Sequence, residues 1–318
     1  MNKIPRLLLL CAAVWCAWPF PQLRAAEPPA RGVIGVSLIT LDNPFFKVIG
    51  DSLTAEAKNH GYTTLVLSAD KDVARQGNQV KDFIVRKVAA IVLSPCERKA
   101  IVPIIQEANA AGIPVLTVDI PCHEPGVKLL TQVATDNLGG GREAAAAIIE
   151  ALGAAGGKVA VLHDKKTESC QLRVAGFREG ISAHNAKGGG KIEIVTELEC
   201  AGAKDLGYRA AEDAVQAHAD LRGIFAINDP AALGARAAVE KARRTDIIIV
   251  GFDGQPEGKQ AIKEGKIFAD PIQFPGRMGV EIVKAIVAYS KGADVPAQTL
   301  IPTQLYRRAD GEKDPELK

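Results

Sequence analysis

The feature that most constrains the fold is a regular alternation of short apolar runs with longer amphipathic stretches. The runs are rich in Val, Ile and Leu, which is typical of strands buried on both faces of a parallel sheet. The stretches between them suit helices that cover those faces. A first series of expected strands comprises Val33–Ile39, Thr63–Ser68, Ala90–Leu93, Val115–Val118 and Leu129–Ala134. A second series comprises Lys158–Leu162, Ile192–Thr196, Gly223–Ala226, Ile247–Phe252 and Lys266–Ile272.

The two series have similar spacing, because each half of the chain opens with a β-α-β-α succession. This doubling predicts an α/β fold with two similar doubly wound parallel-sheet lobes rather than one large sheet. One of the expected helices in the second half covers Arg173–His184. In open parallel sheets, ligands bind outside the carboxyl ends of the strands, so the polar residues at those ends are the candidates for a site.

The first residues have the order of a secretory signal peptide. Lys3 and Arg6 precede an apolar run, Leu7–Phe20, and the small residues Ala25 and Ala26 follow. The run is too short to span a membrane comfortably, and no second long apolar run follows it. We therefore expect residues 1–26 to be a signal peptide, cleaved near Ala25 or Ala26, and the mature chain to be an exported, periplasmic protein.

Composition and motifs exclude several classes of function. The net charge is +2 with the charges well mixed, which gives no reason to expect nucleic acid as a partner. The glycine runs Gly139–Gly141 and Gly188–Gly190 lack the spacing of a dinucleotide-binding loop. The five histidines are scattered, without metal-ligand spacing and without a nucleophile motif. We therefore expect no enzyme activity, no cofactor and no metal.

Two adjacent aromatic residues mark the end of the first expected strand. Asn43 is a suitable helix cap and Pro44 suits the first helical position, so Phe45 and Phe46 fall on the first turn of a helix. Such rings either pack inward as a hydrophobic staple or cover the apolar face of a ligand. This stretch alone leaves both interpretations open.

Polar side chains follow several other expected strands. The residues are Asp119, Asn228, Asp253 and Gln273. One such residue is usually a helix cap, but together with Asn43 they form a set that is harder to explain by capping alone. Carboxylates and carboxamides bind hydroxyl groups, and aromatic rings cover the C–H faces of a sugar. The set therefore indicates a pocket for a polyol or a sugar.

At these positions the chain resembles a known family. The resemblance lies in the segments NPFF (Asn43–Phe46), VATDN–GG (Val133–Gly140), FAINDPAALGA (Phe225–Ala235), VGFDGQPEG (Val250–Gly258) and IQFPGRMG (Ile272–Gly279). They are similar to the periplasmic sugar-binding proteins of ABC importers, in the ribose-binding branch of the type I fold. The resemblance implies two lobes joined by three crossover strands, with the sugar between them. It places 27–135 and 273–302 in the N-terminal lobe, and 136–272 and 303–318 in the C-terminal lobe.

The resemblance also implies roles for single residues. Asn43 would bond a sugar hydroxyl, Phe45 and Phe46 would flank the ring, and Asp119 would bind a pair of hydroxyls. From the second lobe Asn228 and Asp253 would do the same, and Gln273 would bond from a crossover.

The chain also departs from the ribose binders. Ile120 stands where they have an arginine, their other pocket arginine falls on Gln171 with Arg173 as a possible substitute, and Gly202 stands near their second-lobe aromatic. A different monosaccharide, a polyol or a larger ligand is therefore expected.

The expected function is capture of a monosaccharide or polyol and its delivery to the membrane permease of an ABC transporter, by a protein that acts as a monomer. One alternative is a sensor subunit that presents the ligand-bound form to a chemoreceptor or a sensor kinase. A sugar-responsive repressor core is less favoured, because a signal peptide stands where such repressors carry a DNA-binding helix-turn-helix.

Four cysteines lie in the expected mature chain: Cys96, Cys122, Cys170 and Cys200. Cysteines of exported proteins tend to pair in the oxidising periplasm, and each of these pairs follows neighbouring strands. We predict Cys96–Cys122 and Cys170–Cys200 disulfides, with four free thiols as the alternative.

Overall fold

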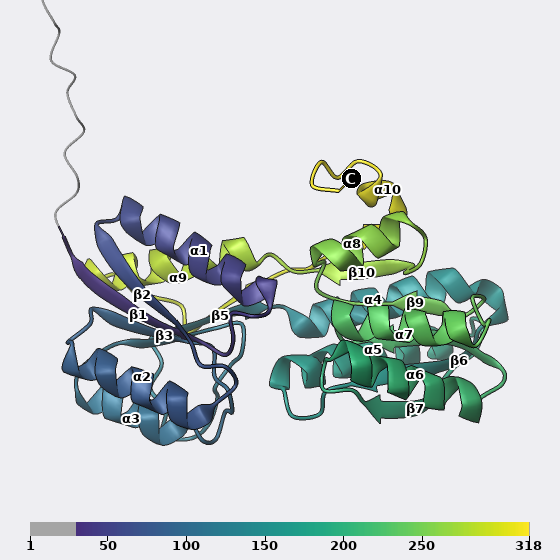
Figure 1. Cartoon of the computed structure of the whole chain (residues 1–318), viewed down its shortest axis with the longest axis horizontal. Helices are drawn as coiled ribbons and strands as arrows, with labels where there is room; N and C mark the ends of the chain where they lie inside the picture. The colour runs from purple at the N-terminus through teal and green to yellow at the C-terminus, as the bar shows by residue number, and fades with distance from the viewer. Residues whose placement is uncertain (1–29, 318) are drawn as a thin grey trace, which may run out of the picture.

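The computed structural model describes residues 30–317, which form two lobes, each built on a six-stranded sheet with helices on both faces (Figure 1). The prediction of two separate, mostly parallel sheets is thereby confirmed. The expected signal peptide, residues 1–26, lies outside the described residues.

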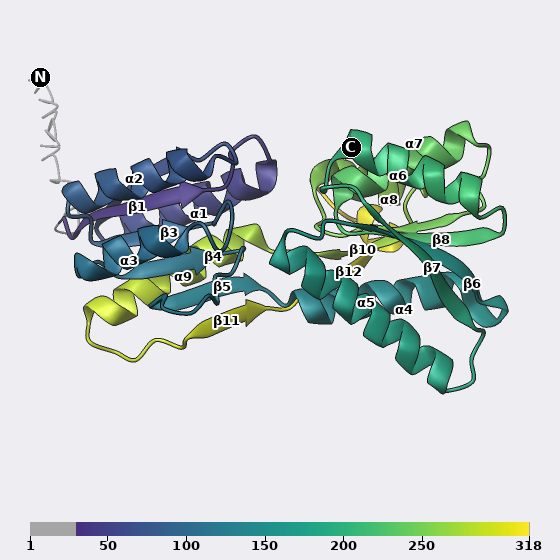
Figure 2. The same ribbon diagram turned by 90° about the horizontal axis from the view of Figure 1, so that it is seen from below.

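The first lobe contains a wholly parallel sheet with the strand order β11-β5-β4-β3-β1-β2. Its strands are β1 (Gly32–Leu38), β2 (Tyr62–Ser68), β3 (Ala90–Leu93), β4 (Val115–Val118), β5 (Thr131–Thr135) and β11 (Gln298–Ile301). Its helices are α1 (Pro44–Asn59), α2 (Val73–Val85), α3 (Val102–Ala110) and α9 (Pro275–Ser290). Helices α1 and α9 pack together on one face, and α2 and α3 cover the other (Figures 1 and 2).

The second lobe repeats this plan with the strand order β12-β10-β9-β8-β6-β7. Its strands are β6 (Gly157–His163), β7 (Ile192–Glu199), β8 (Leu221–Ala226), β9 (Ile248–Val250), β10 (Ala269–Ile272) and β12 (Gln304–Arg307). Its helices are α4 (Asn137–Leu152), η1 (Gly153–Ala155), α5 (Glu168–Ala186), α6 (Lys204–Ala217), α7 (Asp229–Lys241), α8 (Pro256–Lys263) and α10 (Arg308–Gly311). Among the strands described in residues 30–317, only β12 runs antiparallel to its neighbour, β10.

The chain passes between the lobes three times. It leaves the first sheet after β5, returns after β10 into α9, and leaves again between β11 and β12. The resemblance implied only a crossing between residues 302 and 303 here, yet the short strands β11 and β12 each add an edge strand to one of the two sheets. The crossings bring strand ends from both sheets to the space between the lobes (Figure 2).

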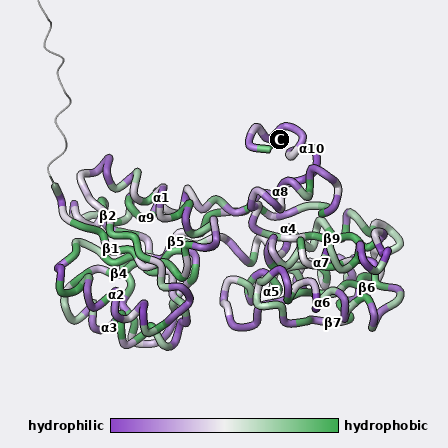
Figure 3. Tube along the Cα trace, viewed as in Figure 1, coloured by the Kyte–Doolittle hydropathy of each residue, from purple (hydrophilic) through white to green (hydrophobic). Residues whose placement is uncertain are grey.

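The strands carry most of the buried apolar side chains in each lobe. Figure 3 shows hydrophobic segments along the sheets and hydrophilic segments on the outer helices. In the first lobe one core cluster lies under α1 and α9 and another under α2 and α3, while the second lobe has a single large cluster. Within residues 30–317, the structure has no helix with the length and apolarity needed to cross a membrane.

The two predicted disulfides are wrong, because the structure has all four cysteines as free thiols. Cys122 Sγ donates a hydrogen bond to the carbonyl oxygen of Arg98 at 3.4 Å. Cys170 lies on the first turn of α5 rather than on a free loop, and Cys200 is fully buried directly after β7. Cysteines that follow neighbouring strands therefore do not necessarily point toward one another. Burial raises the pKa of Cys170 to about 12 and that of Cys200 to about 11, so neither is a reactive thiolate at neutral pH.

Candidate functional site

A cavity of about 160 Å³ lies between the lobes and is lined from both sides. It brings together eight of the nine predicted ligand-binding residues: Asn43, Phe45, Phe46, Asp119, Arg173, Asn228, Asp253 and Gln273. The rule that polar residues at the ends of parallel strands converge therefore holds for both sheets.

The first turn of α1 forms one wall. Asn43 caps the helix, because its Oδ1 accepts the backbone N–H of Phe45 at 3.0 Å, and Pro44 takes the first helical position as expected. The Phe45 and Phe46 rings meet edge to face with centroids 5.3 Å apart. Both rings belong to the core cluster of the first lobe and also line the cavity. The staple and the ligand-wall interpretations are thus compatible in this structure.

Asp119 adds an acceptor to this wall. It follows β4 directly and has a positive φ of 64°, an uncommon conformation for a residue other than glycine. A hydrogen bond from its N–H to Val133 O, 2.9 Å long, holds it there. Its Oδ1 is buried without a hydrogen-bond partner. Burial raises the pKa of Asp119 to about 7, an effect that Asp253 strengthens and Arg173 opposes.

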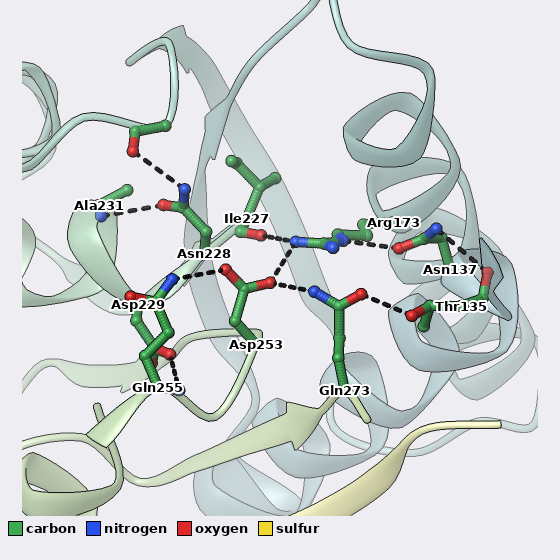
Figure 4. Close-up of polar contacts among 11 residues, drawn as sticks. Thr135, Asn137, Arg173, Ile227, Asn228, Asp229, Ala231, Asp253, Gln255 and Gln273 are labelled. Carbon is green, nitrogen blue, oxygen red and sulfur yellow. Dashed lines mark hydrogen bonds and ion pairs between the residues drawn. The ribbon is translucent and has the colours of Figure 1, made fainter. Parts of the chain in front are cut away.

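Arg173 is the centre of the opposite wall. Its Nε donates to Asn137 Oδ1 at 2.8 Å, and its Nη1 donates to Ile227 O at 2.7 Å and to Asp253 Oδ1 at 2.9 Å (Figure 4). Its guanidinium carbon lies 3.9 Å from the centroid of the Phe252 ring. With only 5% of its side chain exposed, Arg173 forms a buried ion pair, and its Nε and Nη1 are also bonded to neutral oxygens of the protein.

Two glycines position Arg173. A Cβ atom on Gly141 would lie 2.1 Å from Arg173 O, and one on Gly176 would lie 2.0 Å from Leu138 O. Helices α4 and α5 therefore touch backbone to backbone, which brings Asn137 at the start of α4 within reach of Arg173. In the sequence, Gly141 was only part of the glycine run Gly139–Gly141, and nothing marked Gly176.

Asp253 and Gln273 extend the same network. Asp253 has φ 106° and forms an isolated parallel bridge with Ile272, which ties it to β10. Its Oδ1 also accepts Gln273 Nε2 at 2.6 Å, and Gln273 Oε1 accepts the hydroxyl of Thr135 at 2.5 Å (Figure 4). Burial raises the pKa of Asp253, while Arg173 and the hydrogen bonds lower it.

Asn228 caps α7 and is bonded on both sides. Its Oδ1 accepts Ala231 N at 3.0 Å and its Nδ2 donates to Gly202 O at 2.9 Å. It lines the cavity, but the protein already supplies a partner for each end of its amide group.

Gln171 is the predicted residue that the structure does not place in the cavity. Helix α5 begins at Glu168, not at Arg173 as expected, so both residues lie on regular helix. At about 100° per residue, two positions turn a side chain to the opposite face of the helix. The exposed Gln171 Nε2 donates to Lys165 O at 2.6 Å. Arg173, and not Gln171, therefore lines the cavity.

Some cavity residues were missed, among them Lys71, Asp164, Thr167 and Ser169. Asp164 directly follows β6 and Lys71 follows β2 by three positions, so the strand-end rule would have indicated both. Within residues 30–317 there is no group of three His, Cys, Asp or Glu residues arranged to hold a metal ion.

Comparisons with known proteins agree with this geometry. The family model described as periplasmic binding protein domain matches residues 34–294. The ribose import binding protein of Bacillus subtilis is 34% identical over 94% of this chain and 95% of its own length. The D-apiose import binding protein of Paraburkholderia graminis is 31% identical over 89% of this chain and 90% of its own.

A solved ABC transporter solute-binding protein from Mycobacterium smegmatis, with bound glycerol, is 30% identical, with a TM-score of 0.80 over 89% of this chain and 96% of its own. One from Bacillus halodurans, with bound myo-inositol, is 26% identical, with a TM-score of 0.80 over 89% and 97%. With two α/β lobes, an inter-lobe cavity and these relatives, the chain belongs to the periplasmic binding protein family, in its ribose-binding-like branch.

Proposed function

We propose that this chain is the solute-binding protein of an ABC importer for a neutral monosaccharide or polyol. It works in the periplasm as a monomer, after removal of residues 1–26, and delivers its ligand to the membrane permease. Relatives named as import binding proteins for ribose and D-apiose support the importer class. Similar structures with bound glycerol and myo-inositol support a polyhydroxylated ligand.

The observation that carries the proposal is the unpaired Oδ1 of Asp119 in a cavity walled by two phenylalanines. A buried acceptor without a partner is costly, and a ligand hydroxyl removes that cost when it donates to the carboxylate. The rings offer an apolar surface to the C–H groups of the same ligand. One Nη of Arg173 has no hydrogen bond to the protein and remains available as a donor.

The charge of the cavity favours a neutral ligand. Its lining holds three carboxylates, on Asp119, Asp164 and Asp253, against the two cations of Lys71 and Arg173. Arg173 is also already paired with Asp253. A phosphate or a carboxylate on the ligand would therefore meet no excess of positive charge, and the guanidinium that could bind it is already paired with a carboxylate.

The ligand also meets an apolar side chain at Ile120, which lines the cavity. The resemblance to ribose binders implies two pocket arginines, of which Arg173 supplies one and Ile120 replaces the other. The part of the ligand beside Ile120 lacks a charged donor, which favours a C–H or methyl surface there over a sugar oxygen.

The side chains that line the cavity suit the binding of a ligand rather than catalysis. The Cys170 thiol has a pKa of about 12 because it is buried, so it stays protonated and is a poor nucleophile. Asp253 is held by Arg173 and Gln273.

A thermal-shift screen of purified mature protein tests the proposal. The probes are ribose, D-apiose, D-allose, myo-inositol and glycerol, with ribose 5-phosphate as the charged control. A ligand at 100 times its Kd adds about 2.7 kcal/mol to the free energy of unfolding, which shifts Tm by several degrees. We expect at least one neutral compound to raise Tm and the phosphate not to do so. A shift with the phosphate alone, or with none of the probes, would contradict the proposal.

A further inference from the structure

Arg98 joins the two lobes at the rim of the cavity. It lies between β3 and α3 in the first lobe, and its Nη1 is 3.4 Å from Oε2 of Glu168, the first residue of α5 in the second lobe. Both views of the ribbon place the start of α5 at the side of the second lobe that faces the first (Figures 1 and 2). Over residues 30–317, no other hydrogen bond or ion pair joins the lobes away from the three crossings.

The first lobe holds Arg98 in place before any contact with the second. Its Nε lies 3.2 Å from Glu124 Oε1, and its carbonyl oxygen accepts Cys122 Sγ at 3.4 Å. The turn around it is fixed by the Glu97 carboxylate, which accepts the N–H of Lys99 at 3.1 Å and that of Ala100 at 2.6 Å. The guanidinium is therefore oriented by its own lobe, and less side-chain entropy is lost when it meets Glu168.

The second lobe favours a carboxylate at the contact point. Glu168 lies on the first turn of α5, where the positive end of the helix dipole stabilises a negative charge. The same short segment carries three side chains that line the cavity, Thr167, Ser169 and Cys170. A movement of the second lobe that carries Glu168 away from Arg98 would therefore also carry this part of the cavity wall away from the first lobe.

We propose that the Arg98–Glu168 ion pair is an electrostatic latch that biases the two lobes toward the joined arrangement over the cavity. The side chains are 38% and 19% exposed, so the bias is modest and salt screens it. The latch acts with or without ligand. If the joined arrangement is the one that binds ligand, a larger population of it raises the apparent ligand affinity in proportion. This consequence rests on the proposed function.

The test uses ligand-free mature protein, so its outcome is independent of the sugar. Single-molecule energy transfer reports the ratio of joined to separated lobes from one dye at the exposed Lys58 of α1 and one at the exposed Lys187 after α5. The dyes are attached through noncanonical amino acids because the chain has four other thiols. The ratio is measured near 0.01 M and near 1 M ionic strength, where the Debye length is about 30 Å and about 3 Å.

We expect high salt to lower the ratio of the normal protein about two- to fivefold, the range expected of an exposed ion pair. Arg98→Gln and Glu168→Gln should show the lower ratio at both salt concentrations, and the double variant should be no lower than either single one. Arg98→Lys should restore part of the salt-dependent bias. None of these changes should move the thermal midpoint much, because the contact is at the surface.

The matched control is Arg142→Gln. Arg142 pairs with Glu179 at 2.7 Å within the second lobe, so its loss removes a similar ion pair without touching the contact between lobes. An unchanged ratio in Arg98→Gln at low salt would overturn the latch. So would an equal fall in Arg142→Gln, because it would show a general effect of charge.

Discussion

The two walls of the cavity differ in how many of their polar side-chain atoms have hydrogen-bond partners within the protein. The second-lobe wall is a hydrogen-bonded network, in which Asp253 accepts from both Arg173 and Gln273, and Gln273 in turn accepts from Thr135. The first-lobe wall presents two rings and Asp119, whose Oδ1 has no partner. One wall is thus organised before a ligand arrives, and the other is completed by it. The predictions below test this difference, beginning with the largest expected effect.

The hydrogen-bonded network makes Asp253 a structural residue as well as a candidate ligand residue. Asp253→Ala leaves the buried Arg173 charge without its partner and should lower the free energy of unfolding by about 3–5 kcal/mol. Urea denaturation of the ligand-free protein measures this loss. Asp220→Ala is the control, because it breaks the exposed pair with Lys158 and should leave the midpoint nearly unchanged. Equal midpoints in both variants would show that the second wall is not held by this ion pair.

In the first-lobe wall, a substitution at Asp119 should change the free energy of unfolding by a smaller amount and in the opposite direction. Asp119→Asn replaces a buried carboxylate, one oxygen of which has no partner, by a neutral amide, and we expect it to raise the free energy of unfolding at pH 8 by about 1–3 kcal/mol. The same variant should bind the best ligand of the screen about 10- to 100-fold more weakly, since a charged acceptor is lost. Denaturation and calorimetry measure the two effects. A loss of stability with unchanged affinity would reverse the roles assigned to the walls.

Buried carboxyl groups should also give the ligand-free protein a pH dependence. The pKa of Asp270 is raised from 3.8 to about 6 and that of Asp119 from 3.8 to about 7, in both cases mainly by burial. Because the folded state binds these protons more tightly, their contribution to stability is fully present below pH 3.8. It is lost as the pH rises through about 6 and about 7.

We therefore expect the carboxyl contribution to make the urea midpoint fall between pH 5 and pH 8. Asp270→Asn should reduce this fall, because the variant has one fewer buried group to ionise. Midpoints measured at both pH values for the two proteins provide the test. An equal fall of the urea midpoint in the variant and the normal protein would mean that Asp270 does not change its protonation state between pH 5 and pH 8.

The smallest effect is expected at the rings. Phe45→Leu and Phe46→Leu each keep an apolar side chain in the first-lobe core, but each removes a flat surface from the cavity. At least one of them should weaken ligand binding by about 1 kcal/mol or more. Calorimetry on folded variants checks this. Unaltered affinity in both would leave the pair with only its role as a hydrophobic staple.

The sequence predicted those parts of the site that depend on local rules. Asn43 and Pro44 are favoured residues for the start of a helix, and they start α1 here. Asp119, Asn228 and Asp253 lie in the cavity because each comes within three positions of the end of a strand of a parallel sheet. The choice between Gln171 and Arg173 could not be made in this way. It depends on the residue at which α5 begins and on the close contact of α4 with α5 at Gly141.

The cysteines and the last two strands show another limit. Whether two thiols meet depends on the direction of each side chain, and strand order alone says nothing about that for Cys170 on its helix. Strands β11 and β12 are four residues each, with polar residues among the apolar ones, so no hydrophobic run marks them. Their pairing with β5 and β10 comes from the tertiary arrangement.

The return of the chain into the first lobe after β10 has a consequence for the order of folding. Ile49 and Leu53 of α1 are covered by α9, where Met278 and Ile282 belong to the same core cluster. Contacts between residues so far apart in the chain form slowly, because a long loop must close first. During synthesis, the apolar face of α1 stays uncovered until the whole segment from α4 to β10 has been made and α9 emerges. The first lobe is therefore made first but is among the last parts of the chain able to complete its core.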